Sequence, residues 1–73
     1  MIFGQFVQQK RKCLKISQQA LTDACGFANH SNISRLEAGQ FEWKLREVVS
    51  VARLFGLEAS DLLAEFENEN HQN

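Results

Sequence analysis

The sequence predicts an all-α domain of five short helices. Its 73 residues contain no proline, and no stretch alternates apolar and polar residues as a half-buried strand does. Gly26, Gly39 and Gly56 each follow a segment whose apolar residues recur at helical spacing. Glycine readily adopts the left-handed conformation that closes a helix, so each of the three is expected to end one. A chain of this length has room for a single hydrophobic core.

The first two helices are expected before Gly26. One runs from Ile2 to about Leu14, with its apolar side chains at helical spacing. The other begins after Ser17, because a serine side chain can accept a hydrogen bond from the free amides at the start of a helix. It is expected to end at Cys25.

Three further helices complete the expected domain, with the segment QFEWK as a loop between the first and second of them. They span Asn29 or His30 to Ala38, Leu45 to Phe55, and Ala59 to Phe66. Residues 1–67 are expected to form the folded domain. The polar segment 68–73 has no apolar anchor and is expected to be disordered.

The charges are segregated along the chain, although the formal net charge is only −1. Every charged residue before Ser17 is positive, and every acidic or basic residue after Leu57 is negative. Two interpretations stand side by side. The chain either presents one basic face behind a net charge near zero, or it has two ordinary solvated ends.

The opening segment and the two cysteines predict a cytoplasmic protein whose thiols are reduced. The opening segment MIFGQFV is too short for a signal peptide and lacks its basic residues, and no apolar run reaches the length of a membrane span. Cys13 and Cys25 have no further ligands at metal-binding spacing. We interpret them as free thiols, with Cys25 in the core and Cys13 nearer the surface. No cofactor is expected.

Two short helices joined by a glycine-containing turn, the second with a polar outer face, are typical of a helix-turn-helix. Four segments, which cover all five expected helices, carry a resemblance to a known family: GQFVQQKRK, ISQQALTDACG, ISRLEAG and LREVVSVARLFGLEASDLL. On these residues, from about Gly4 to Leu63, the chain resembles the Cro/C1-type (XRE-type), lambda-repressor-like DNA-binding family. The resemblance implies a lambda-repressor-like fold whose second and third helices form the helix-turn-helix of a transcriptional regulator.

The resemblance also implies roles for particular residues. Arg11 stands where the family has an arginine that pairs with the glutamate of its LE.G motif, here Glu37. Gln18 stands where the family has a glutamine that contacts a backbone phosphate. The chain departs from the family at Lys15, where glycine is common. It departs again in FANHSN, which has one residue more than the usual turn.

The third expected helix would read base edges in the major groove. Arg35 is the preferred reader, because a guanidinium can donate two hydrogen bonds to O6 and N7 of guanine. The extra turn residue leaves open which of the residues before Ile33 reaches a base. The candidate base-reading residues are His30, Ser31, Asn32, Ser34 and Arg35. The candidate phosphate contacts are Ser17, Gln18, Gln40, Lys44 and Arg11.

Neither a metal site nor an enzyme is expected. His30 has no companion ligands at a suitable spacing, and no nucleophile with an orienting carboxylate accompanies it.

The expected partner is double-stranded DNA with a palindromic operator. One domain covers one half-site, so a homodimeric repressor is expected, of the phage, mobile-element or restriction–modification controller type. The apolar residues that could form the dimer interface could equally all belong to the core; they are Leu57, Leu62, Leu63 and Phe66. Phe41 and Trp43 either seal the edge of the core or join a partner surface. The alternatives are an antitoxin that also binds a toxin, and a protein-interaction module that has lost DNA binding.

Overall fold

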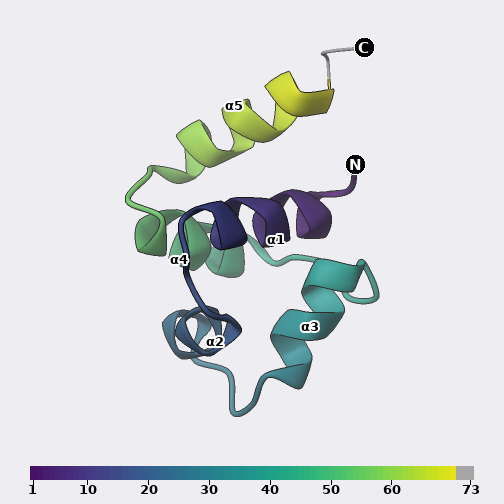
Figure 1. Cartoon of the computed structure of the whole chain (residues 1–73), viewed down its shortest axis with the longest axis vertical. Coiled ribbons are helices and arrows are strands. Elements are labelled where there is room, and N and C mark those ends of the chain that lie inside the picture. The colour runs from purple at the N-terminus through teal and green to yellow at the C-terminus, as the bar shows by residue number, and fades with distance from the viewer. Residues whose placement is uncertain (71–73) are drawn as a thin grey trace.

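Five α-helices follow one another along the chain, as the sequence predicts (Figure 1). The computed structural model describes residues 1–70, and over that range it contains helices and no strand. The helices are α1 (Phe3–Cys13), α2 (Gln18–Cys25), α3 (Ser31–Ala38), α4 (Leu45–Leu54) and α5 (Ala59–Asn70). The prediction of an all-α chain with five helices is therefore confirmed for the described residues.

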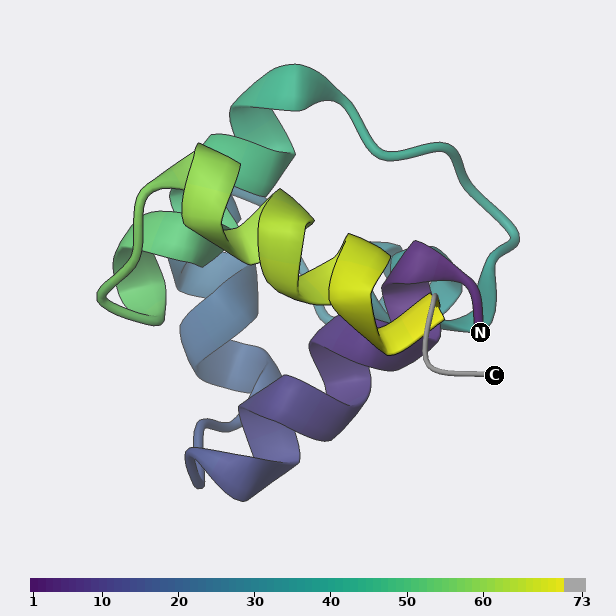
Figure 2. The same cartoon turned by 90° about the horizontal axis from the view of Figure 1, so that it is seen from above.

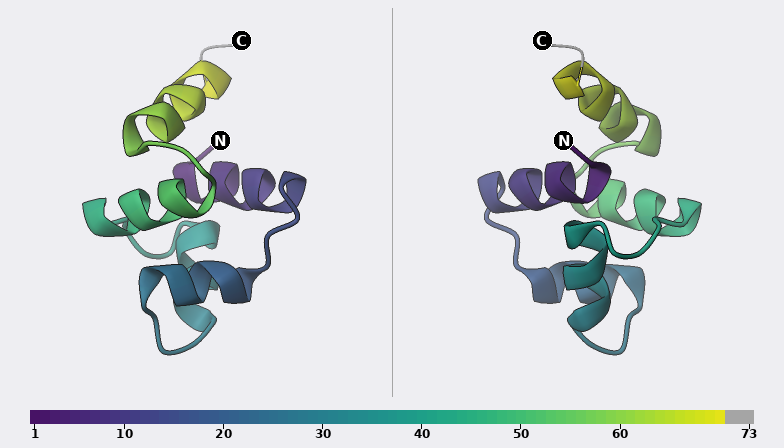
Figure 3. Two further views of the ribbon diagram at one scale, coloured as in Figure 1. Left: turned by 90° about the vertical axis from the view of Figure 1, so that its left-hand side faces the viewer. Right: turned by 90° about the vertical axis from the view of Figure 1, so that its right-hand side faces the viewer.

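The helices are arranged in three levels. Helices α1 and α4 lie in the middle, with α5 on one side of them and with α2 and α3 on the other (Figures 1 and 3). Helix α5 begins beside α4 and ends near the start of α1 (Figure 2). At that end the amino group of Met1 donates to Oδ1 of Asn70 over 3.1 Å. Helix α3 is consequently far from α5, with the middle level between them.

Every helix contributes to one hydrophobic core. In α3 and α4 the buried apolar side chains recur at helical spacing, so each of these helices has one inward face. Helix α4 contributes three of these residues, and its β-branched side chains are held by tertiary burial rather than by helix propensity. The core residues are Phe6, Val7, Leu21, Ile33, Leu36, Val48, Val51, Ala52 and Leu62.

An aromatic cluster covers one edge of this core. The rings of Phe3 and Trp43 meet edge to face with their centroids 5.1 Å apart, and those of Phe3 and Phe66 meet in the same way at 5.3 Å. Phe6 lies 5.5 Å from Phe66 and completes the cluster. Of the two roles left open for Trp43, the structure shows the first, because this side chain packs against the core edge.

Helix α5 is longer than expected. The sequence placed its end at Phe66 and disorder from residue 68, whereas the helix continues to Asn70. The expectation is therefore wrong for residues 68–70, and residues 71–73 lie outside the described part of the chain. Glu67 and Glu69 are good helix formers, and the contact between Met1 and Asn70 joins the last turn to the start of the chain.

The chain reverses at left-handed residues, three of which are the expected glycines. Gly26, Gly39 and Gly56 have φ values of 73°, 82° and 78° and end α2, α3 and α4. Within residues 1–70 Lys15 is the one non-glycine residue with positive φ, at 60°. It lies in the corner between α1 and α2, where the family resembled commonly has glycine. A side chain with a Cβ atom is strained in this conformation.

We predict that Lys15→Gly raises the free energy of unfolding by about 1 kcal/mol, since relief of left-handed strain exceeds the entropy cost of glycine. Urea denaturation followed by circular dichroism measures the change. Lys12→Gly is the matched control, because it removes the same charge within α1, and it should lower the stability by about 0.5–1 kcal/mol. A lower urea midpoint for Lys15→Gly would contradict the assignment of strain to this corner.

Candidate nucleic-acid interface

Helix α3 has one buried face and one exposed polar face. Ile33 and Leu36 are 0% and 2% exposed and anchor the helix in the core, as expected from the sequence. The exposed face carries residues at spacings of three and four, which places them on one side of a helix. The exposed residues are Ser31, Ser34, Arg35 and Ala38. This surface therefore consists of short side chains and one long cation.

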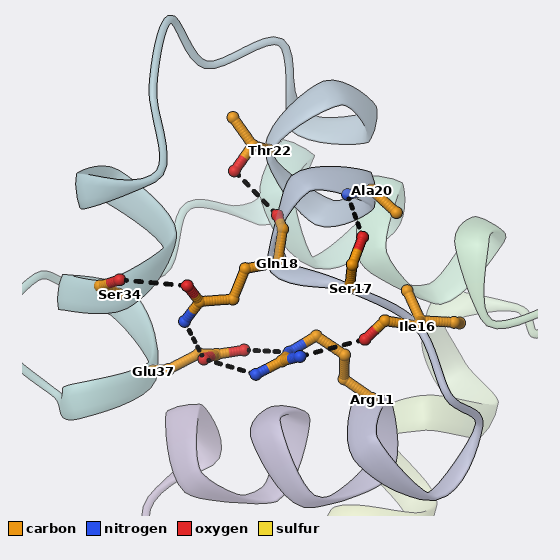
Figure 4. Close-up of polar contacts among 8 residues, drawn as sticks. All are labelled: Arg11, Ile16, Ser17, Gln18, Ala20, Thr22, Ser34 and Glu37. Atoms are coloured by element: carbon orange, nitrogen blue, oxygen red, sulfur yellow. Dashed lines mark hydrogen bonds and ion pairs between the residues drawn. The ribbon is translucent and has the colours of Figure 1, made fainter.

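A buried network fixes the end of α3 against α1 and α2 (Figure 4). Glu37 is 3% exposed, and its Oε2 accepts from Nε of Arg11 over 2.8 Å. Its Oε1 accepts from Nη2 of Arg11 over 3.3 Å and from Nε2 of Gln18 over 3.0 Å. The Oε1 of Gln18 then accepts from the hydroxyl of Ser34 over 3.4 Å. The structure thus contains the predicted pair of Arg11 and Glu37, and Gln18 extends it to the exposed face of α3.

The same contacts bury Arg11 inside the protein. This residue is only 8% exposed, and its Nη1 donates to the carbonyl oxygen of Ile16 over 3.0 Å in addition to its bonds with Glu37. Each nitrogen of the guanidinium thus donates one hydrogen bond within the protein, and its contact with a DNA phosphate stays a prediction. The resemblance predicted the ion pair, but the sequence did not show how deeply Arg11 is buried.

Gln18 is half-buried and has a structural role of its own. Both ends of its amide are engaged, with Glu37 as one partner and Ser34 as the other. An amide nitrogen has two donor hydrogens, so one of them remains for an external acceptor. Its contact with a phosphate stays a prediction.

The start of α3 separates the three residues that the sequence left unresolved. Oδ1 of Asn29 accepts from the backbone amide of Ser31 over 3.0 Å and from its hydroxyl, so Asn29 satisfies one free amide of the first turn, while the N-cap position itself is His30. His30 and Ser31 are exposed. Asn32 is half-buried and lines a hollow between α3 and the loop that leads to α4, together with Leu36. Of the three, His30 and Ser31 are thus the more accessible.

The remaining phosphate candidates lie at the surface. Ser17 caps α2, and its hydroxyl oxygen accepts from the amide of Ala20 over 3.1 Å. Gln40 and Lys44 are exposed in the loop after α3. Their side chains are available to an external partner.

The charges are segregated in space as well as in sequence. Helix α5 carries four acidic residues and lies on the side of the molecule away from α3 (Figures 1 and 3). Nζ of Lys10 pairs with Oε1 of Glu65 on this helix over 2.6 Å. The acidic end of the chain therefore does not cover the exposed face of α3.

The four residues suggested for a dimer interface do not form one exposed patch. Leu62 is fully buried and anchors α5 in the core, so its assignment to an interface is wrong. Leu57 and Phe66 are half-buried and pack against the same core. Leu63, which is 40% exposed, is the member of the set that offers a substantial apolar surface. From the sequence alone, an apolar residue of the last helix could face either the core or a partner. In the structure Leu62 faces the core, whereas Leu63 is exposed.

The two cysteines are free thiols in different surroundings. Cys13 is exposed, whereas Cys25 is half-buried and packs against the core. Burial raises the pKa of the Cys25 thiol, and the negative charge of Glu47 raises it further. Within residues 1–70 no group of three or more histidine, cysteine or acidic side chains is arranged to hold a metal ion.

Comparisons with protein-family models, with curated proteins and with solved structures find no match for this chain. None of the helices in residues 1–70 is both long enough and apolar enough to cross a membrane. A function must therefore be inferred from the residues and geometry of the chain itself.

We predict that Glu37→Ala lowers the free energy of unfolding by about 3–5 kcal/mol, because it leaves the buried charge of Arg11 without a partner. Urea denaturation followed by circular dichroism tests this. The double variant Arg11→Met with Glu37→Met removes both charges and should recover most of the lost stability. Equal losses in the single and double variants would show that shape, rather than charge, decides this site.

We also predict that iodoacetamide alkylates Cys25 more slowly than Cys13 at neutral pH. A raised pKa means a smaller thiolate fraction at every pH below it, and the thiolate is the reactive form. Mass spectrometry of the native protein, with Cys13→Ser to isolate Cys25, measures the two rates. In denaturant the rates should converge, and a persistent difference there would assign the effect to local sequence instead of burial.

Proposed function

We propose that this protein is a sequence-specific double-stranded DNA-binding transcriptional regulator, a homodimeric repressor whose α3 enters the major groove. The observation that carries the proposal is the outer face of α3. It combines short hydrogen-bonding side chains with an exposed Arg35, while Glu37 holds the opposite face in the protein. The major groove admits a single helix, and a face of this kind can approach base edges without steric conflict.

In this proposal α2 and α3 form a helix-turn-helix. The two helices contact one another and are joined by residues 26–30. The hydrogen bonds of Gln18 with Glu37 and Ser34 support a fixed angle between them. A fixed angle matters because a reading helix must enter the groove in one orientation while its neighbour lies across the backbone.

Phosphate contacts would flank the reading helix. The start of α2 offers free backbone amides and the Ser17 hydroxyl, and helix starts favour anions. Gln40 and Lys44 follow α3 and are exposed. Helix α5, which carries four acidic residues, lies on the opposite side of the molecule, so it would not face the DNA backbone (Figure 3). This arrangement supports the first of the two interpretations of the charge pattern, one basic face behind a net charge of −1.

Dimerisation would supply the second half-site. A single reading helix gives modest specificity, and two helices placed one turn of DNA apart read a palindrome. Leu63 is the candidate from the sequence that remains exposed for such a contact.

The decisive experiment selects binding sites from a random duplex library and measures the dissociation constant by gel shift. The wild type should select a palindromic site. Arg35→Ala should bind about 5–150-fold more weakly and lose the preference for one base pair in each half-site, because a bidentate arginine–guanine contact contributes about 1–3 kcal/mol. Arg53→Ala, which removes an exposed arginine from α4, is the matched control and should bind as the wild type does.

The salt dependence provides a second test of the same proposal. The logarithm of the binding constant should fall with the logarithm of the salt concentration, with a slope that corresponds to few neutralised phosphates. A flat dependence would contradict phosphate binding. Failure of the wild type to select any sequence at low salt would reject the regulator and favour the protein-interaction module.

A further inference from the structure

Phe41 lies against the one arginine on the exposed face of α3. Cζ of Arg35 is 5.4 Å from the centroid of the Phe41 ring, which is within the range of a cation–π contact. Phe41 is 43% exposed, although it is a large apolar side chain in a polar loop. The sequence left two roles open for Phe41, which were sealing the edge of the core and joining a partner surface. Because much of the ring is exposed, burial at the core edge accounts for only part of its surface.

The end of α3 places this ring beside the helix. Gly39 has a left-handed φ of 82°, and its amide donates to the carbonyl oxygen of Leu36 over 3.2 Å. The amide of Gln40 donates to the carbonyl oxygen of Arg35 over 2.9 Å. These bonds turn the chain back at the end of the helix, so Phe41 returns to the level of Arg35. The ring also lines the hollow beside α3, together with Phe27 and Leu36.

The ring holds the guanidinium without occupying its donors. In residues 1–70 the ion pairs join Lys10 with Glu65 and Arg11 with Glu37, and neither includes Arg35. A carboxylate partner would restrain Arg35 but would accept the same N–H groups that a ligand needs. An aromatic face attracts the positive charge through its quadrupole and leaves the five N–H donors free. A restrained side chain also loses less rotamer entropy when it binds.

We propose that Phe41 is a positioning residue that holds Arg35 in the orientation in which it reads a guanine, so that a pair of residues sets specificity at that base pair. The proposal rests on the proposed function, in which α3 lies in the major groove. Phe41 itself need not touch DNA. Its effect on binding should therefore depend entirely on the presence of Arg35.

The contact is tested first in the free protein. NMR of the Arg35 side chain is compared in the wild type, Phe41→Leu and Phe41→Trp. Leucine keeps an apolar group beside the hollow but removes the aromatic face, and tryptophan keeps such a face. We expect ring-current shifts and slowed motion of the Arg35 Nε–Hε group in the wild type and in Phe41→Trp, and their loss in Phe41→Leu. Identical Arg35 signals in the wild type and Phe41→Leu would overturn the proposal, whatever the protein binds.

The second test is a double-mutant cycle on the duplex that the wild type selects from the random library. Phe41→Leu should weaken binding about two- to five-fold, the range expected for an exposed cation–π contact. In the Arg35→Ala background the same substitution should have no effect, and Phe41→Trp should bind as the wild type does. Replacing the contacted guanine by 7-deazaguanine removes N7 and should reduce the penalty of Phe41→Leu.

The outcomes separate the two proposals. If Phe41→Leu costs the same affinity with and without Arg35, the positioning role is overturned while DNA binding stands. If the wild type selects no duplex although NMR shows the Arg35–Phe41 contact, the proposed function fails, and the guanine-reading role of the pair fails with it. The control is Leu45→Ala, which removes another exposed apolar side chain from the surface and should leave both measurements unchanged.

Discussion

The arrangement of the first three helices depends on one buried ion pair. A carboxylate as deeply buried as that of Glu37 is costly to remove from water unless it is paired and hydrogen-bonded. Arg11 and Gln18 supply those partners from two other helices, so the charge is satisfied in the one packing that brings all three together. A buried ion pair of this kind contributes more to selecting one packing of the helices than to the net free energy of folding. Because this packing fixes α3 against α1 and α2, it also fixes the direction in which the outer face of α3 points.

The molecule separates its surfaces by level. The middle helices α1 and α4 carry most of the core, α5 carries four of the nine acidic residues on one side, and α3 exposes its polar stripe on the other (Figure 1). In the proposed function, this division keeps the acidic residues of α5 away from a polyanion bound at α3. The aromatic cluster around Phe3 and Phe66 reaches the loop after α3 through Trp43, so it joins α1 and α5 to the segment that carries Gln40 and Lys44.

The sequence was sufficient where signals are local or where two matched positions identify a partner. Helical spacing and the closing glycines predicted the five helices, and the resemblance predicted the pair of Arg11 and Glu37. The role of Leu62 and the full burial of Arg11 depend on which surfaces meet in three dimensions, and a one-dimensional pattern does not contain that information. The contact of Phe41 with Arg35 has the same origin, because it requires the reversal after α3.

Gly4 places a second constraint on α3, which acts through the backbone rather than through the side chains of the ion-pair network. A Cβ atom built at this position would lie 2.2 Å from the carbonyl oxygen of Leu36 and 2.7 Å from that of Glu37. Because the obstacle is main chain, no repacking of neighbouring side chains can make room for a larger residue. A residue larger than glycine at position 4 would therefore push α3 away from α1. If α3 reads DNA as proposed, its outer face can vary to change the preferred sequence, while position 4 must keep glycine to hold the helix in place.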